Sequence, residues 1–480
     1  EEQEIGLVRR LAWRELCPWL MLFRSFRLAM SLPILFLATV GAVLTPCGWY
    51  LAAELFGTPQ TAVDSPLAQW PGSLSLQSQT GVGIRLPGDR EAAAPSGLAK
   101  EPGGSLSGTA TALLRGAARA SLKVYWRFVG PVLLLRDRYA SLSEVGYYLV
   151  GAIWTIVVWS FFAGAITRIA AVELGREERI SLNEALSHAR KNYGWYVATP
   201  FFPLMGIVCA AIPIFILGLI MRWLDLGVLL AGLVWPLVLL CGVVIAVLLL
   251  GFVFGWPLMW PTISSEENGD AFEAFSRSFS YIFQRPLHYL FYGAVAAALF
   301  SLCWLLVNVA ASAVIESGNW AAAWGAGNAR MHPVLTGPAL GASLSAGAEQ
   351  PAESPQRTAA AESGVVQVGS FLIRFWVVLV RTIAAAFNDS FFWCAATAIY
   401  LLMRRDVDQT DFDEVFMEGE ETRYSLPPLK SDECGVPSTT EAAGKPAEAT
   451  SATPLAPGDA QPAAEGTSAE GTRPAEEPPK

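Results

Sequence analysis

The sequence predicts an all-α protein, a polytopic transmembrane helical bundle with amphipathic interfacial helices, disordered outward loops and a disordered C-terminal tail. Of the 480 residues, 53% are apolar and 16% are charged, whereas roughly 25% are charged in ordinary soluble domains. About six stretches are apolar over the roughly 20 residues that a spanning helix needs. These stretches alternate with segments rich in Gly, Ser, Pro and Ala.

The ends of some predicted spans are marked clearly by the sequence, and the ends of others are not. The third and fourth are joined by a short turn around residues 222–225, and Arg374 and Arg381 interrupt the first half of the sixth. That half either crosses the membrane or lies at the interface, and Thr382–Met403 is the firm part. The six spans are 31–56, 145–172, 196–221, 227–254, 287–315 and 371–403, with 145–315 forming the core bundle.

The N-terminal segment 1–30 carries apolar residues at helical spacing beside arginines, which predicts an amphipathic cytoplasmic helix. The apolar residues are Trp13, Leu16, Trp19, Leu20 and Phe23. The basic flank of the first span also fits a cleaved signal peptide. Because the apolar run is long and no clear small-residue cleavage pattern follows, we interpret it as a retained helix.

Lys and Arg in short loops predict which side of the membrane is cytoplasmic. Basic residues cluster within 9–27, 176–191 and 277–285 and at 404–405, all on one side if six spans are counted. The basic residues within 115–138 argue the other way, but that loop is long and the rule discounts long loops. We therefore expect a multi-pass protein of the bacterial inner (cytoplasmic) membrane with both termini in the cytoplasm.

The two outward connections, 57–144 and 316–370, lack the apolar periodicity of an independent core. Within the first, the apolar residues of 117–135 predict an interfacial or re-entrant helix. A segment that packs under the bundle is an equally good interpretation. The cytoplasmic tail 404–480 is rich in Pro, Ala, Glu and Thr beyond about residue 422, so we expect it to be disordered.

An internal repeat stands out on the predicted cytoplasmic side: residues 177–187 and 266–276 align without a gap and share five identical positions. In each copy an N-cap residue precedes a carboxylate by three positions, Ser181 before Glu184 and Asp270 before Glu273. Each copy predicts an amphipathic helix on the membrane surface, over 181–194 and 270–284. The second helix has an apolar face of Phe272, Phe275, Phe279 and Phe283.

These paired helices, each between an inward and an outward span, resemble the bacterial six-helix membrane proteins of the YciC type and the membrane domain of glycerophosphodiester phosphodiesterases. Residues 162–170 and 256–261 also resemble uncharacterised multi-pass proteins of planctomycetes. The resemblance covers spans two to six and implies a membrane fold in the cell envelope. It implies no catalytic residue, and no phosphodiesterase catalytic domain is present.

The sequence offers little chemistry. P-loop, HExxH and GxSxG patterns are missing, the seven cysteines form no CxxC, and no basic nucleic-acid-binding domain occurs. We therefore expect no enzyme, no catalytic residue, no metal, no cofactor and no nucleic-acid partner. The expected partners are the lipid bilayer and a protein bound through the C-terminal tail.

Ionisable groups at membrane depth are the remaining hint of function. Asp389, beside Asn388, precedes Met403 by fourteen residues, so it lies roughly 21 Å from that end of the helix at about 1.5 Å per residue. Arg381 lies about two turns further out. Arg381, Asn388 and Asp389 therefore predict an intramembrane polar site that binds an anionic headgroup or gates a path. The alternative is helix pairing, with the arginine reaching to the interface.

Three functions fit these observations. The first is a structural or accessory protein of the cell envelope, because low-complexity loops surround a bundle without a catalytic set. The second is a transporter or permease component, because Glu184-Ala185-Leu186 is similar to the coupling loop of ABC permeases. Arg190 stands where that loop requires Gly. The third is a lipid-handling membrane protein.

Overall fold

The computed structural model describes residues 17–57, 70–73, 79–80, 106–134, 141–267, 269–327, 330–331, 334–335, 364–417, 430–431 and 437–438. The chain divides into two units, Glu1–Met417 and Glu418–Lys480. In the second unit, the described residues form one antiparallel pair, β1 (Lys430–Ser431) and β2 (Pro437–Ser438). Most residues of the predicted disordered loops and tail lie outside the described ranges.

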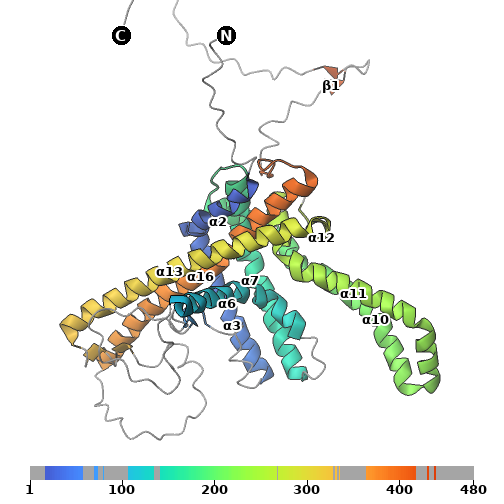
Figure 1. The fold of residues 1–480 in the computed structure, drawn as a ribbon, viewed down its shortest axis with the longest axis horizontal. Helices are drawn as coiled ribbons and strands as arrows, with labels where there is room; N and C mark the ends of the chain where they lie inside the picture. The colour runs from blue at the N-terminus through green and yellow to red at the C-terminus, as the bar shows by residue number, and fades with distance from the viewer. Residues whose placement is uncertain are drawn as a thin grey trace, which may run out of the picture. The chain divides into compact units, whose positions relative to one another are not determined.

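The described part of the first unit is helical, which confirms the predicted all-α polytopic bundle (Figure 1). The elements are η1 (Pro18–Leu20), α2 (Met21–Ala29), α3 (Leu32–Phe56), α6 (Leu106–Leu134), α7 (Leu142–Gly175), α8 (Leu182–Lys191), α9 (Tyr193–Ala198), α10 (Phe201–Trp223), α11 (Asp225–Ser265), α12 (Ala271–Gln284), α13 (Pro286–Ala326) and α16 (Gly364–Asp408).

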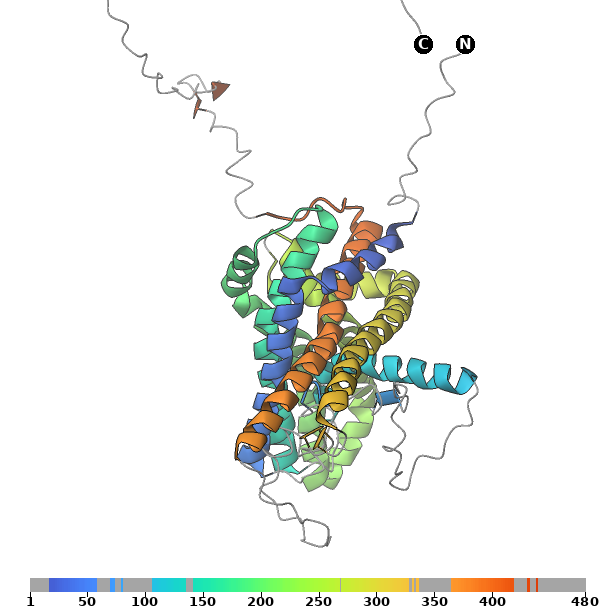
Figure 2. The ribbon, with the colours of Figure 1, turned by 90° about the vertical axis from the view of Figure 1, so that its left-hand side faces the viewer.

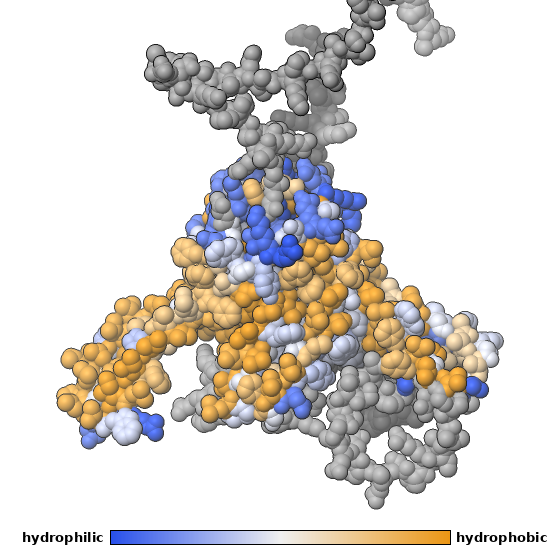
Figure 3. All heavy atoms as spheres, turned by 180° about the vertical axis from the view of Figure 1, so that it is seen from behind, coloured by the Kyte–Doolittle hydropathy of each residue, from blue (hydrophilic) through white to orange (hydrophobic). Residues whose placement is uncertain are grey.

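Six helical segments in the described residues are long and apolar enough to cross a membrane. They belong to three packed pairs, α3 with α7, α10 with α11, and α13 with α16. In Figure 1 these pairs diverge from the end of the unit at which α2 and α12 lie. Polar residues gather at that end, whereas apolar residues cover the pairs (Figure 3). The protein is therefore a multi-pass integral membrane protein.

Glycine allows the closest approach within the first pair. A Cβ atom built on Gly48 of α3 would lie 2.0 Å from the Trp154 ring of α7, and one on Gly151 of α7 would lie 2.3 Å from the Trp49 ring of α3. Neither distance is possible between real atoms, so each indole occupies the place of a missing side chain. This reciprocal arrangement fixes the register of α3 against α7.

Several helices extend beyond the ends of the predicted spans. The fourth span was predicted to end at Phe254, but α11 continues through Pro257 and Pro261 to Ser265. α13 runs to Ala326 and α16 from Gly364, so both take in residues predicted as outward loop. Hydropathy marks where a helix leaves lipid and says nothing of a helix that continues in water or against protein.

The tail was predicted to begin at residue 404, but the first unit extends to Met417. Residues 404–417 belong to the first unit, because α16 reaches Asp408 and the following residues fold back on the bundle. Val415 is buried, and the backbone N–H of Phe416 donates to the carbonyl of Ser265 at 3.0 Å. A few apolar residues in a polar sequence are enough to attach this segment to the bundle.

The two repeated helices begin with the side-chain caps that the sequence suggests. Ser181 Oγ accepts from the Glu184 N–H at 3.2 Å to begin α8, and Asp270 Oδ1 accepts from the Glu273 N–H at 2.7 Å to begin α12. Each bond satisfies one of the N–H groups that a helix start leaves unpaired. α8 ends at Lys191, and the short α9 takes up the rest of the predicted helix.

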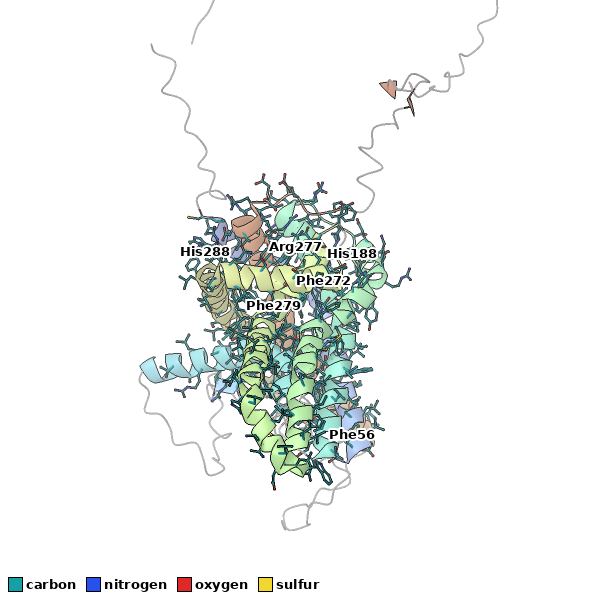
Figure 4. The ribbon with its side chains drawn as sticks, turned by 90° about the vertical axis from the view of Figure 1, so that its right-hand side faces the viewer. Phe56, His188, Phe272, Arg277, Phe279 and His288 are labelled. Carbon is teal, nitrogen blue, oxygen red and sulfur yellow. The ribbon has the colours of Figure 1, made fainter. Side chains whose placement is uncertain are left out.

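α12 carries two apolar faces of different kinds. Its small face, which includes Ala271, Ala274 and Ser278, is buried against the bundle. Its phenylalanine face, with Phe272 and Phe279, lies on the side of α10 and α11 (Figure 4). Phe272 is 61% exposed and adds to the apolar outer surface, whereas Phe279 packs against Gly251 of α11.

Candidate intramembrane binding site

α6 runs crosswise to the neighbouring long helices, at a level between Phe279 and Phe56 (Figures 1, 2 and 4). The sequence placed this segment in an outward loop and left 117–135 open between an interfacial or re-entrant helix and a segment that packs under the bundle. The helix begins at Leu106, and its second half enters the centre of the bundle, where Val124 and Val129 are buried. Because protein covers this half, the structure agrees with the packed alternative rather than with an interfacial helix.

Aromatic rings hold the inner half of α6 in place. The Phe128 ring stacks on Trp256 of α11 with a centroid separation of 4.6 Å. It also meets the edges of Trp260 and Trp393 at 5.7 and 5.9 Å. Trp260 and Trp393 stack on each other at 4.7 Å, which joins α11 to α16 beside α6. Such large rings bury much apolar area and interact favourably in these geometries.

A proline provides the polar link between α6 and α11. Pro257 has no N–H, so the carbonyl of Val253, four residues earlier, loses its helical donor. The Tyr125 hydroxyl of α6 donates to that carbonyl. Nearby, the Tyr289 hydroxyl of α13 donates to the carbonyl of Phe254 at 2.7 Å. The Tyr125 hydroxyl thus satisfies the carbonyl that Pro257 leaves without a helical donor, and α11 continues through this position as a helix.

Further along α6, Arg127 forms a buried ion pair with Asp389 of α16, with 2.6 Å between Nη1 and Oδ1. The two side chains are 13% and 3% exposed. The Arg127 guanidinium also lies over the Trp159 ring, 5.3 Å from its centroid, a favourable cation–π position. The Trp159 indole donates to Thr45 Oγ1 at 2.9 Å, so α3, α6, α7 and α16 meet here.

A polar cavity of about 60 Å³ lies beside this ion pair. That volume suits a few water molecules or one small anionic group. Lys123 stands one turn before Arg127 and, within the described part of the chain, forms no ion pair of its own. Two cations and one carboxylate leave one positive charge in excess. The polar residues that line the cavity include Thr45, Lys123, Arg127, Asn308, Asn388 and Asp389.

A second, apolar cavity of about 250 Å³ lies between α6, α11, α13 and α16. It exceeds the roughly 150 Å³ apolar cavity that is known to bind benzene. Val124 and Asn388 line both cavities, so the two adjoin. Asn388 Oδ1 is buried without a hydrogen-bond partner. Because buried polar atoms are nearly always satisfied, this oxygen points to a missing donor.

The structure brings together two of the three residues of the predicted polar site. Asn388 and Asp389 line the polar cavity, but Arg381 lines neither cavity and is half-buried elsewhere on α16. The cation on Asp389 is Arg127, which sequence reasoning placed in a discounted loop. A signal was present: Arg115, Arg119, Lys123 and Arg127 recur every four residues, which places them along one face of a helix.

The four capping residues of the repeated helices lie away from both cavities. The ion pairs near the second cap connect α12 to neighbouring helices. Arg277 of α12 pairs with Glu273 at 2.8 Å, Asp408 at 3.2 Å and Glu266 at 3.5 Å (Figure 4). The Tyr281 hydroxyl donates to Asp408. Burial, followed by this carboxylate, raises the pKa of Tyr281. These contacts tie α12 to the end of α16.

The described residues contain no group of three or more His, Cys, Asp or Glu placed to hold a metal ion. Comparisons of the chain with family models, curated proteins and solved structures found no match. Fold and site together define a polytopic α-helical integral membrane protein that contains a charged cavity next to an apolar one.

Proposed function

We propose that the protein handles lipid, by binding the anionic group of a membrane component between Lys123 and Arg127. The observation that carries the proposal is the excess positive charge of the polar cavity. A charge buried at membrane depth is costly unless it is paired, and such residues are usually functional. Asp389 neutralises only one of the two cations, so an anionic ligand would complete the pairing.

The proposal includes a location. We place the protein in a bacterial inner membrane, with both termini and the end formed by α8 and α12 in the cytoplasm. Support comes from the basic residues that precede and follow the spans on that side and from the polar surface there (Figure 3). The YciC-type resemblance and the internal repeat agree with this placement and stay predictions.

Lipid binding by the purified full-length chain tests the proposal. The protein is transferred into nanodiscs that contain phosphatidic acid and phosphatidylcholine, and the lipids retained on extraction are counted by native mass spectrometry. We expect retention of the anionic lipid to fall about tenfold in Lys123→Gln, which corresponds to roughly 1.4 kcal/mol. Arg190→Gln is the matched control, because it removes an exposed cation of α8.

Equal retention in both variants and in the natural protein would contradict the proposal. That result would favour a structural or accessory role, which is the first function inferred from the sequence. It requires a protein partner that is retained through the tail and no dependence on Lys123. The permease hypothesis has no separate support in the described contacts and stays a prediction.

A further inference from the structure

We infer that the ligand is a phospholipid that enters sideways from the membrane, with its phosphate at Lys123 and Arg127 and one acyl chain in the apolar cavity. This inference rests on the proposed function, because it requires the anion site. It adds the chemical class of the ligand, the place of its chain and the direction of its access.

α6 borders both cavities with different side chains. Lys123 and Arg127 line the polar cavity, whereas Leu122 and Tyr125 line the apolar one. Successive helical residues point in different directions, so one helix serves both cavities. Asn388 borders both. A ligand with an anionic head and an apolar chain matches two adjoining cavities of opposite polarity, and an inorganic anion matches only one.

The apolar cavity opens at its edge between α6 and α13. Leu122 of α6, at its edge, is 61% exposed, and Ala297 of α13 is also exposed. The neighbouring outer surface of α13 is apolar, with Leu290, Leu302 and Leu306 exposed. In a bilayer such a surface faces lipid tails. The mouth of the cavity therefore faces the hydrocarbon, from which a chain can slide in.

α6 carries a basic face that leads to the polar cavity. Arg115 and Arg119 are exposed and, within the described residues, form no ion pair. Their spacing continues that of Lys123 and Arg127, so the four cations follow one helix face inward. Arginines near a bilayer interior attract anionic lipid headgroups and water. This face supplies successive binding positions for a phosphate that moves toward the cavity.

The charge balance then selects among headgroups. With Asp389 held by Arg127, one positive charge remains for the ligand. The phosphate monoester of phosphatidic acid carries at least one negative charge and neutralises it. A choline headgroup brings its own cation, which Lys123 would repel in a medium of low dielectric constant. The site should therefore prefer anionic phospholipids to zwitterionic ones.

The experiment blocks the apolar cavity, in which the acyl chain is placed, and leaves the charges of the polar cavity unchanged. Ala297→Phe places a ring at the cavity mouth, and Ala298→Phe, also exposed on α13 but not part of the lining, is the matched control. Both variants and Lys123→Gln are made in the full-length chain, in detergent. Binding of phosphatidic acid, phosphatidylcholine and inorganic phosphate is measured by native mass spectrometry, and size-exclusion profiles confirm folding.

We expect Ala297→Phe to weaken phosphatidic acid binding about tenfold, or roughly 1.4 kcal/mol, whereas Ala298→Phe binds as the natural protein does. Lys123→Gln should weaken it as strongly without touching the apolar cavity. If Ala297→Phe binds phosphatidic acid normally while Lys123→Gln does not, the chain placement is wrong and the anion site stands. Inorganic phosphate that competes fully with the lipid would identify a soluble anion as the ligand. If Lys123→Gln also binds normally, the proposed function fails as well.

Discussion

Two helices of this protein, α6 and α12, both run across the long helices, yet they use their charges in opposite ways. On α12, Arg277 is surrounded by three carboxylates and lies at the polar end of the bundle. On α6, Arg127 pairs with the single carboxylate of the polar cavity, and Lys123 beside it has no ion-pair partner among the described residues. A cation that is fully paired with carboxylates stabilises the packing of helices. A cation without a carboxylate partner next to a cavity can bind an anionic ligand.

The largest expected effect comes from breaking the ion pair of α6. Asp389→Ala leaves Arg127 buried and unpaired, and removal of one partner of such a pair costs about 3–5 kcal/mol. We expect a marked fall in the thermal unfolding temperature in detergent, followed by circular dichroism. The triple variant Lys123→Met, Arg127→Met and Asp389→Leu should recover most of the loss, since the cavity then holds no buried charge. Normal stability of Asp389→Ala would show that the pair is absent in the membrane.

The next effect compares phenylalanines on the two helices. Phe128→Ala opens a hole among Trp256, Trp260 and Trp393 and should lower the free energy of unfolding by about 3–5 kcal/mol. Phe272→Ala on α12 should cost little, because that ring is 61% exposed. Urea unfolding in micelles, followed by tryptophan fluorescence, measures both. Equal costs would mean that α6 does not enter the bundle.

The smallest effect concerns the ion pairs that connect α12 to neighbouring helices. Arg277→Ala removes a side chain that is 32% exposed, and water and salt screen such pairs, so the loss should be about 1 kcal/mol or less. The loss should shrink at high salt. Anionic lipid binding should stay unchanged, because Arg277 lines neither cavity. Lower lipid retention in this variant would mean that the ion pairs of Arg277 affect lipid binding at the cavity.

Hydropathy and capping patterns were enough to predict the bundle and the starts of α8 and α12. The part of the site on α16 could also be predicted, because Asp389 interrupts an apolar run. The spacing of the cations on α6 indicated a basic helix face, but not that Arg127 pairs with Asp389, because the two residues lie 262 positions apart in the sequence. The choice of Arg381 followed from nearness in sequence, whereas pairing depends on which helices meet.

Photochemical crosslinking tests the central claim most directly. A phosphatidic acid with a photoreactive group in its acyl chain is added to the protein in nanodiscs, irradiated, and its attachment sites are mapped by peptide mass spectrometry. The account predicts labelling at cavity residues such as Leu122, Ala296 and Phe391, with loss of that labelling in Lys123→Gln. Labelling confined to the exposed outer surfaces of α10 and α11, unchanged in Lys123→Gln, would contradict it.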